Sequence, residues 1–395
     1  MKKKILASFL VACMAVGLAA CGNSNSDSSK GTTNSSATGE QDASNSGSGA
    51  VGKKHFVVAG GYGETHGYNA DAQAALDLLV ECSDGQYSYD LYNGGSLVKF
   101  LSEYEGLKDG TSDMSISLDP LVNTHTPYSE VFMLPIISGD AVQLTKAAQA
   151  VYASDVEIDN GRTYYEHDFL DNGIKAFPYS ACSPYMLSFS SKFKDVKSAS
   201  DIDATTRIRS TTRTNSMFLE SLGVTPVTLS MNEIYDAFSK GSVDGMVGCA
   251  AWESSYGIGE FAGETIYDAP IGIYVSVFSM TTDTWDSLDD SVKEAFEAKW
   301  NDTMLSIVEK GEGWESVFKE NWDNVLAQNA SKVSLSEMDE DFQELYDKAC
   351  GETWTKWVDD LNSKGLNGTG MAILWRDALL EQGCEVPSAA MEITE

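Results

Sequence analysis

Apolar and polar residues follow two kinds of spacing in the first part of the chain after residue 54. Short apolar or alternating runs at 55–62, 86–92 and 113–118 are typical of β-strands. Between the first two runs, apolar residues recur at i, i+3, i+4, i+7 and i+8 from Ala72, the spacing of a helix that buries one face. The run 96–110 predicts a second helix. Strands that alternate with helices over short links predict a parallel sheet covered by helices.

The same alternation returns farther along the chain. The pattern predicts a helix at 140–153, a strand at 173–179, a strand containing Arg207 and Arg209, a helix at 214–223, strands at 226–229 and 243–248, and between these two a helix that ends at Gly241. An apolar strand at 271–280 is expected to return to the first domain. The long helix predicted from residue 282 follows both domains, so we expect it to lie across them. Two more helices are predicted at 339–364 and 370–382.

The N-terminus has the composition of a targeting segment. Three lysines, a short apolar run and small residues precede Cys21, which predicts a signal peptide over 1–20. Leu18 to Cys21 resembles a bacterial lipobox, in which the cysteine is lipidated; an ordinary signal peptide cleaved nearby is the alternative. Residues 21–53 are rich in Ser, Asn and Gly without apolar periodicity, which predicts a disordered tether. The expected location is the extracytoplasmic face of the cell membrane, reached through the lipid only.

Composition narrows the classes of partner. The formal net charge of −32 argues against nucleic acid and anionic membrane surfaces as partners. The cysteines and histidines show no metal-binding spacing, and we expect no metal or cofactor. Five cysteines lie beyond the predicted tether: Cys82, Cys182, Cys249, Cys350 and Cys384. A disulfide between Cys350 and Cys384 and a set of free thiols both remain open.

An arginine cluster is the first candidate for a binding site. Three of the five arginines in the chain, Arg207, Arg209 and Arg213, fall within seven residues. In so acidic a chain this cluster predicts a place that holds an anion. Ligands of parallel α/β sheets bind beyond the carboxyl ends of the strands, so the loops 61–67 and 119–125 are candidate walls of the site. These loops contribute Tyr62, Glu64, His66 and Asp119 as candidate ligand-binding residues.

Several motifs together resemble one family over nearly all of residues 55–330. The segments that carry the resemblance are 63–97, GLKDGTSDMSIS, EVFMLPII, TRIR and LGVTPVTLSMNEIYDAFSKGSVDG. They resemble the DctP-like substrate-binding proteins of TRAP transporters, the tripartite ATP-independent systems. The last segment is the most specific, because Glu233, Tyr235, Ala237, Asp244 and neighbouring glycines share one register.

The resemblance implies a fold and a domain plan. The fold class is α/β, a two-lobed periplasmic-binding-protein-like fold with a long helix spanning both lobes. We expect the first lobe to comprise 54–184 plus 274–312, and the second 185–273 plus 313–395 with the C-terminal helices. The implied function is that of a receptor, expected to be monomeric, that closes around a small organic acid and delivers it to membrane permease subunits.

The resemblance also assigns a key residue. The arginine that ends the family's lys-x-Arg strand, which binds a ligand carboxylate, is Arg209 here. A second arginine found in many members is replaced by Ser188 or Phe189, and the usual Glu-Asn pair by Val247 and Gly248. These departures favour a ligand with one carboxylate and a less polar remainder. We therefore add to the candidate ligand-binding residues Tyr185, Ser188, Phe189, Gly248 and Trp252.

Three other functions are weighed. A solute-binding lipoprotein of an ATP-driven importer would have a similar bilobed fold, but the arginine strand and the Glu-x-Tyr-x-Ala run argue against it. An enzyme is disfavoured because the sequence contains no phosphate-binding loop, nucleophile elbow or Cys/His pair, and no catalytic residue is assigned. A purely structural surface lipoprotein would show no stabilisation by a ligand.

Overall fold

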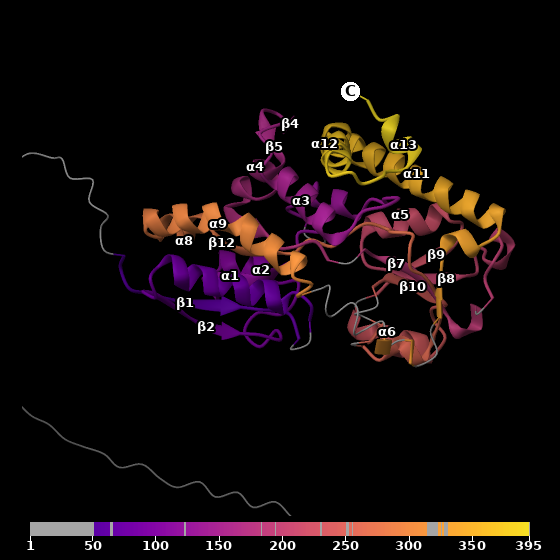
Figure 1. Cartoon of the computed structure of the whole chain (residues 1–395), viewed down its shortest axis with the longest axis horizontal. Coiled ribbons are helices and arrows are strands. Elements are labelled where there is room, and N and C mark those ends of the chain that lie inside the picture. The colour runs from indigo at the N-terminus through magenta and orange to yellow at the C-terminus, as the bar shows by residue number, and fades with distance from the viewer. Residues whose placement is uncertain are drawn as a thin grey trace, which may run out of the picture. The chain divides into compact units, whose positions relative to one another are not determined.

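The computed structural model shows two main β-sheets, each covered by helices, in an α/β fold (Figure 1). The structure describes residues 51–63, 66–121, 124–182, 184–193, 195–229, 231–249, 253–254, 256–313, 323–324, 326–327 and 331–394. The predicted signal peptide, nearly all of the predicted tether and Cys21 lie outside these residues. We call each sheet, together with the helices that cover it, a lobe.

The first sheet has five strands in the order β2-β1-β3-β12-β6. Its strands are β1 (Lys54–Ala59), β2 (Tyr87–Tyr92), β3 (Met114–Leu118), β6 (Ile174–Pro178) and β12 (Val277–Thr281). β1 is parallel to β2 and β3, whereas β12 is antiparallel to β3 and β6. The returning apolar strand is shorter than predicted, because residues 271–276 form a connection between the lobes instead.

Amphipathic helices cover the first sheet. The longer ones are α1 (Asn69–Cys82), α3 (Ala141–Tyr152) and α9 (Asp290–Glu309). Four of the five predicted apolar positions of α1 are buried, and so are the apolar residues Val292, Phe296, Trp300, Met304 and Ile307 that recur near helical spacing in α9. Trp300 of α9 donates an indole hydrogen bond to the carbonyl of Pro178 at 2.8 Å, so burial of this ring leaves its N–H satisfied. Shorter elements of this lobe are α2 (Glu103–Lys108), η1 (Ser129–Met133), β4 (Glu157–Asp159), β5 (Arg162–Thr163), α4 (Tyr164–Asp168), η2 (Leu170–Asn172) and α8 (Thr282–Ser287).

The helix predicted at 96–110 is shorter than expected. α2 occupies only 103–108, because the chain before it turns through left-handed conformations at Gly94, Gly95 and Leu101. Leu101 has φ of 70° and is 53% exposed. A left-handed conformation is costly for a residue with a side chain and interrupts a helix.

The second sheet has six strands in the order β13-β11-β7-β10-β8-β9. Its strands are β7 (Met186–Ser190), β8 (Arg207–Ser210), β9 (Thr225–Thr228), β10 (Gly245–Gly248), β11 (Ala262–Ile266) and β13 (Ser331–Val333). β8 is parallel to β9 and β10, and β7 is antiparallel to β10 and β11. The other elements are α5 (Arg213–Ser221), α6 (Met231–Ser239) and the short helices η3 (Ser191–Phe193), η4 (Ala199–Asp201), η5 (Ile258–Glu260) and η6 (Leu335–Glu337).

Two chain segments cross between the lobes side by side. Their backbones are joined by hydrogen bonds from Tyr179 N to Ser276 O at 3.0 Å and from Cys182 N to Tyr274 O at 3.1 Å. Gly272 in the second crossing has φ of 91°, and a Cβ there would lie 2.5 Å from backbone atoms of Met133. Glycine is therefore required for this close approach.

A long helix that contacts both lobes is α11. α9 packs mainly on α1 and α3 of the first lobe. α11 (Glu340–Ser363) packs on α5 of the second lobe, and its Trp354 donates to the carbonyl of Pro135, next to η1, at 2.8 Å. Two further helices follow, α12 (Gly368–Glu381), which packs on α3, and α13 (Ser388–Met391) (Figure 1). Periodicity shows that a face is buried but not which surface buries it, so it did not single out α11.

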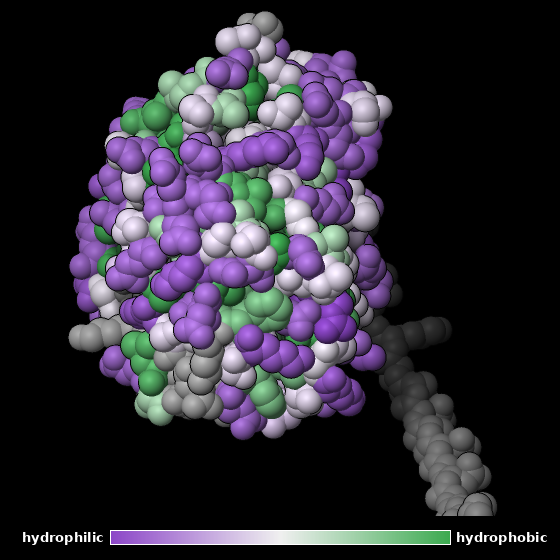
Figure 2. Space-filling view, turned by 90° about the vertical axis from the view of Figure 1, so that its right-hand side faces the viewer, coloured by the Kyte–Doolittle hydropathy of each residue, from purple (hydrophilic) through white to green (hydrophobic). Residues whose placement is uncertain are grey.

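Several properties of the described residues bear on function. The end of the molecule at the second sheet is mainly hydrophilic, with small scattered apolar spots (Figure 2). Among these residues no helix is long and apolar enough to cross a membrane, and no group of His, Cys, Asp or Glu side chains could hold a metal ion. The five cysteines within the described residues are free thiols, including Cys350 and Cys384.

Candidate functional site

A cavity of about 330 Å³ lies between the two lobes. It lies beyond the carboxyl ends of β1, β3, β8 and β9, which is where ligands of open α/β sheets bind. Its volume is within the range of small-molecule sites. The residues that line it are Gly61, Tyr62, Gly63, His66, Phe100, Leu101, Asp119, Leu121, Tyr185, Arg209, Thr211, Thr212, Thr228, Leu229, Tyr256 and Tyr274.

Arg209 supplies a positive charge to the cavity wall. It stands near the end of β8 and is only 1% exposed. Its Nε donates to the carbonyl of Leu229 at 3.0 Å, and its Nη1 is 3.4 Å from the carbonyl of Val247. Burial lowers the pKa of Arg209 to about 10, so the guanidinium remains cationic at neutral pH. The two carbonyls orient a charged group that can hold an anion with further N–H donors.

The other two arginines of the cluster are engaged elsewhere. Arg207 begins β8, and its guanidinium binds Asp244 at 3.1 Å and the carbonyl of Gly241 at 2.8 Å. Arg207 and Arg209 share a strand face, but they point to opposite ends of the strand. Arg213 donates to Glu130 at 3.0 and 3.1 Å and also contacts Asp360 of α11. Neither arginine is among the residues that line the cavity.

Aromatic rings form much of the wall contributed by the first lobe. The rings of Tyr62 and His66 stack with centroids 4.0 Å apart and planes 3° apart. The hydroxyl of Tyr62 donates to the hydroxyl of Ser276. Burial lowers the pKa of His66 to about 3, so this imidazole is neutral at physiological pH and presents a flat polar surface rather than a charge.

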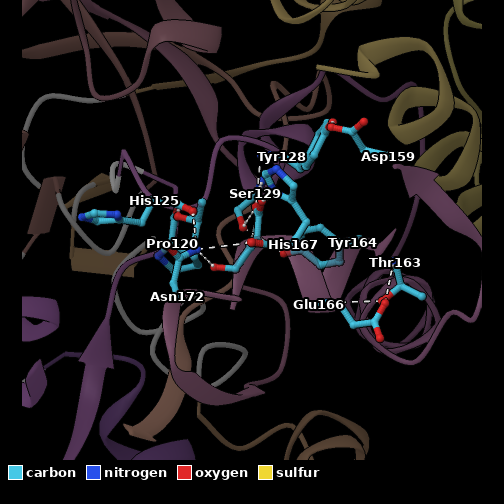
Figure 3. A network of polar contacts seen from close by, with 12 residues as sticks. Pro120, His125, Tyr128, Ser129, Asp159, Thr163, Tyr164, Glu166, His167 and Asn172 are labelled. Atoms are coloured by element: carbon cyan, nitrogen blue, oxygen red, sulfur yellow. Dashed lines mark hydrogen bonds and ion pairs between the residues drawn. The ribbon is translucent and has the colours of Figure 1, made fainter. Parts of the chain in front are cut away.

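Asp119 places an acidic group in the same wall. It follows β3 directly, and its Oδ1 accepts the backbone N–H of Leu121 at 2.9 Å. The loop beyond it is held by two contacts, from the Thr126 hydroxyl to the carbonyl of Pro120 at 2.6 Å and from the Asn172 amide to the carbonyl of His125 at 2.9 Å (Figure 3). Such contacts limit the movement of the loop that carries the acid.

A buried carboxylate anchors the far end of this loop. Asp168 accepts the backbone N–H groups of Tyr128 and Ser129 at 3.1 and 2.9 Å and the Ser129 hydroxyl at 3.0 Å. Its other oxygen lies 2.8 Å from Nδ1 of His167. Burial raises the pKa of Asp168 to about 6 in spite of these bonds. The hydroxyl of Tyr128 in turn accepts from the backbone N–H of Asn367, which links the network to the start of α12.

Hydroxyl groups dominate the wall on the second lobe around Arg209. Thr211 and Thr212 follow β8, and Thr228 ends β9. Thr212 also caps α5 by accepting the backbone N–H of Asn215 at 3.1 Å. The cavity thus combines one guanidinium, one carboxylate, several hydroxyls and an aromatic lining, an arrangement suited to binding a small polar aromatic molecule rather than to catalysis.

The predicted site residues divide into three groups. Tyr62, His66, Asp119, Tyr185 and Arg209 come together in the cavity wall, although they are far apart in sequence. Glu64 and Trp252 lie outside the described residues, and so does Asn123 of the second predicted loop.

The third group lies away from the cavity wall. Ser188 faces the same side of the second sheet as Arg209, but β10 separates them and the Ser188 hydroxyl donates to Glu253. Phe189 points to the opposite face, because side chains alternate along a strand, and packs on Phe193. Gly248 ends β10, pairs with Met186 and has no side chain to offer.

Several lining residues escaped the sequence-based prediction. Phe100 and Tyr274 fall inside the helix and the strand predicted at 96–110 and 271–280, but they lie in a turn and a crossing segment, and Tyr256 lies in an irregular segment. Thr211 and Thr212 carried a signal, since they follow the arginine strand at its carboxyl end.

Comparison with known proteins identifies the class of this chain. The family model for bacterial extracellular solute-binding proteins, family 7, matches residues 62–353. No curated protein matches the chain.

Solved structures show the same fold. A TRAP solute-binding protein from a marine metagenome (unidentified microbe), in complex with 3-hydroxybenzoate, is 19% identical, with a TM-score of 0.70 over 84% of this chain and 99% of that one. A TRAP solute-binding protein from Rhodoferax ferrireducens with copurified benzoate is 18% identical, with a TM-score of 0.67 over 83% and 98%. An extracytoplasmic solute receptor from Bordetella pertussis that binds pyroglutamic acid is 16% identical, with a TM-score of 0.63 over 82% and 99%. Because the family model covers more than half of the chain, the protein belongs to the family 7 extracellular solute-binding proteins, the receptors of TRAP transporters, and is not an enzyme.

Proposed function

We propose that this receptor binds a small aromatic carboxylate through Arg209 and delivers it to a TRAP permease. The observation that carries the proposal is the position of Arg209, a buried cation in the wall of a cavity between two lobes. A planar guanidinium matches a carboxylate through two parallel charge-assisted hydrogen bonds. Net charge of −32 makes the protein as a whole repel anions, so a local cation is needed to hold one.

The aromatic part of the ligand follows from the rest of the wall. Tyr62, Tyr185, Tyr256 and Tyr274 present ring surfaces to the cavity, as does His66 in its neutral form. Rings stack favourably on a flat aromatic ligand. Two of the similar structures hold benzoate or 3-hydroxybenzoate, which supports this ligand class. An ATP-driven importer is not favoured as the partner, because the family match is to a TRAP receptor family.

A thermal-shift screen tests the proposal. Benzoate, 3-hydroxybenzoate, pyroglutamate and glucuronate are added to the mature protein, and at least one aromatic acid is expected to raise the melting temperature, since a ligand that binds only the native state stabilises it. Arg209→Ala is expected to abolish the shift, whereas Arg207→Ala, a matched change on the same strand, is expected to keep it. Equal shifts in the parent and in Arg209→Ala would contradict the role of Arg209.

We further propose that the lobes close around the ligand. The two crossing segments at 179–185 and 271–276 would act as the hinge, because the chain passes from one lobe to the other there. A ligand that contacts both walls favours the closed state by its differential affinity. Small-angle scattering should show compaction when a ligand identified by the screen is added; an unchanged radius of gyration would contradict closure.

Anchoring by a lipid on Cys21 completes the proposal. Cleavage before Cys21 would leave the receptor as a monomer tethered to the extracytoplasmic face of the membrane through residues 21–53. Mass spectrometry of the mature N-terminus should find a diacylglyceryl cysteine. A free N-terminus at another residue would indicate an ordinary secreted form.

A further inference from the structure

We propose that the ligand carries a hydrogen-bond donor, either a hydroxyl or an ammonium group, at the end opposite its carboxylate, and that Asp119 receives this donor with Glu103 behind it. The inference rests on the proposed function, because it assumes that Arg209 holds the carboxylate. It makes Asp119 the residue that determines which aromatic acids bind.

Asp119 lines both the main cavity between the lobes and a second pocket on the first lobe. This smaller, adjoining pocket has a volume of about 190 Å³, and Leu101 belongs to both walls. Glu103 and Glu105 line the smaller pocket. The cavity therefore has a cationic end on the second lobe and extends, on the first lobe, toward a group of carboxyls.

One buried polar atom near Asp119 has no partner within the described part of the chain. Glu103 is 1% exposed; its Oε1 accepts the hydroxyl of Ser117 at 2.8 Å, but its Oε2 makes no hydrogen bond. Buried polar atoms without a partner are uncommon in folded proteins and call for an explanation. Tyr274 is 6% exposed and lines the cavity, and its hydroxyl lies close to that of Tyr62. A ligand whose donor reaches Asp119 would also bring a polar group to Tyr274.

The charges of the two walls favour a ligand with unlike ends. Tyr185 lines the cavity; burial raises its pKa most, and of the two charged cavity residues Asp119 raises it and Arg209 lowers it. Burial is also the main cause that raises the pKa of Tyr62, Tyr274 and Glu103, and the charge of Asp119 raises each further, so these side chains are close to it. A second carboxylate at this end would meet like charge, whereas a donor meets an acceptor.

Four probes of similar size test the inference by titration calorimetry on the full mature chain. Benzoate has no second group, 3-hydroxybenzoate and 3-(aminomethyl)benzoate carry the two kinds of donor, and isophthalate carries a second carboxylate. At least one donor probe is expected to bind 10-fold or more tightly than benzoate, and isophthalate more weakly. The better of the two donor probes identifies the donor as a hydroxyl or an ammonium group.

Two variants locate the effect. Asp119→Asn is expected to reduce the advantage of the donor probe over benzoate about 10-fold and to improve isophthalate. Tyr274→Phe removes only one hydroxyl from the cavity wall and is expected to reduce the same advantage about threefold. Circular dichroism melts verify that both variants are folded.

The outcomes separate this inference from the proposed function. If benzoate binds as tightly as both donor probes, or if Asp119→Asn weakens all probes equally, the inference is overturned while the role of Arg209 stands. If none of the four probes binds, both are overturned for this class of ligand.

Discussion

The two walls of the cavity are built in different ways. The wall on the second lobe is built around two strand ends, with Arg209 on β8, two threonines directly after it and Thr228 at the end of β9, and Tyr185 and Tyr256 beside them. The wall on the first lobe draws on separate segments, with the hydroxyl of Tyr62 hydrogen-bonded to Ser276 and the loop after Asp119 held by Asp168. The centre of the first of these walls is local in sequence, whereas the other wall depends on contacts between residues that are distant in sequence.

This difference corresponds to a difference in chemistry. The local wall presents a guanidinium and hydroxyls, which suit any carboxylate. The wall from distant segments presents Asp119 and aromatic rings, which distinguish one carboxylate from another. We therefore expect one lobe to bind the carboxylate of the ligand and the other to discriminate among the rest of the ligand. A substitution in one wall should leave the binding energy from the other wall largely intact.

Among substitutions, the largest expected effect comes from changing Asp168, which anchors the loop in the wall of the first lobe. Asp168→Ala removes the acceptor for two backbone N–H groups and a hydroxyl in a buried site, and is expected to lower the free energy of unfolding by about 3 kcal/mol. Asp168→Asn keeps an acceptor and should lose about 1 kcal/mol. Urea denaturation measures both; equal losses would show that volume rather than hydrogen bonding matters at this position.

A smaller effect is expected from substituting Arg209 in the wall of the second lobe. Arg209→Lys keeps the charge but loses the planar fork, so affinity for the aromatic acid identified in the screen should fall about 10- to 100-fold with little change in stability. Arg207→Lys on the same strand should alter affinity less than about twofold, because Arg207 binds Asp244 rather than the cavity. Calorimetric titration compares the two, and similar losses would contradict the assignment.

The free energy of unfolding should depend on pH through the buried acids of both lobes. Burial raises the pKa of Asp71, Glu103 and Glu253 to about 7 and of Asp168 to about 6. The folded chain therefore binds protons that the unfolded chain has already released, and stability is lost as pH rises from about 4 to about 7. His66 acts in the opposite sense, since its pKa falls to about 3 and the unfolded chain takes up a proton below about 6.5.

These four acids outweigh His66 over the range from pH 7.5 to 5.5. The free energy of unfolding should rise by about 5 kcal/mol across this range, measured by urea denaturation at each pH. Asp71→Asn in the first lobe and Glu253→Gln in the second should each reduce the slope. If neither variant changes how the free energy of unfolding varies with pH, the pH dependence arises from surface charges instead.

Sequence patterns predicted the parts of this protein that depend on neighbours in the chain. The helix stripe from Ala72 and the apolar positions of α9 are confirmed because a period of 3.6 residues reports burial directly. The motif register singled out Arg209 rather than Arg207 or Arg213, and the structure places it alone of the three in the cavity wall. The interruption at Leu101 was missed because apolar periodicity carries no information about backbone conformation.

Tertiary structure decided what the sequence left open. Which helix contacts both lobes, which side chains join Arg209 and where Ser188 points all depend on how strands distant in sequence pair. The sequence by itself determined the family, the alternation of strands and helices and the presence of a cation at a strand end, because these follow from local spacing and residue type. The acidic and aromatic wall opposite that cation exists only after the crossing segments and the loop beyond β3 have been brought together.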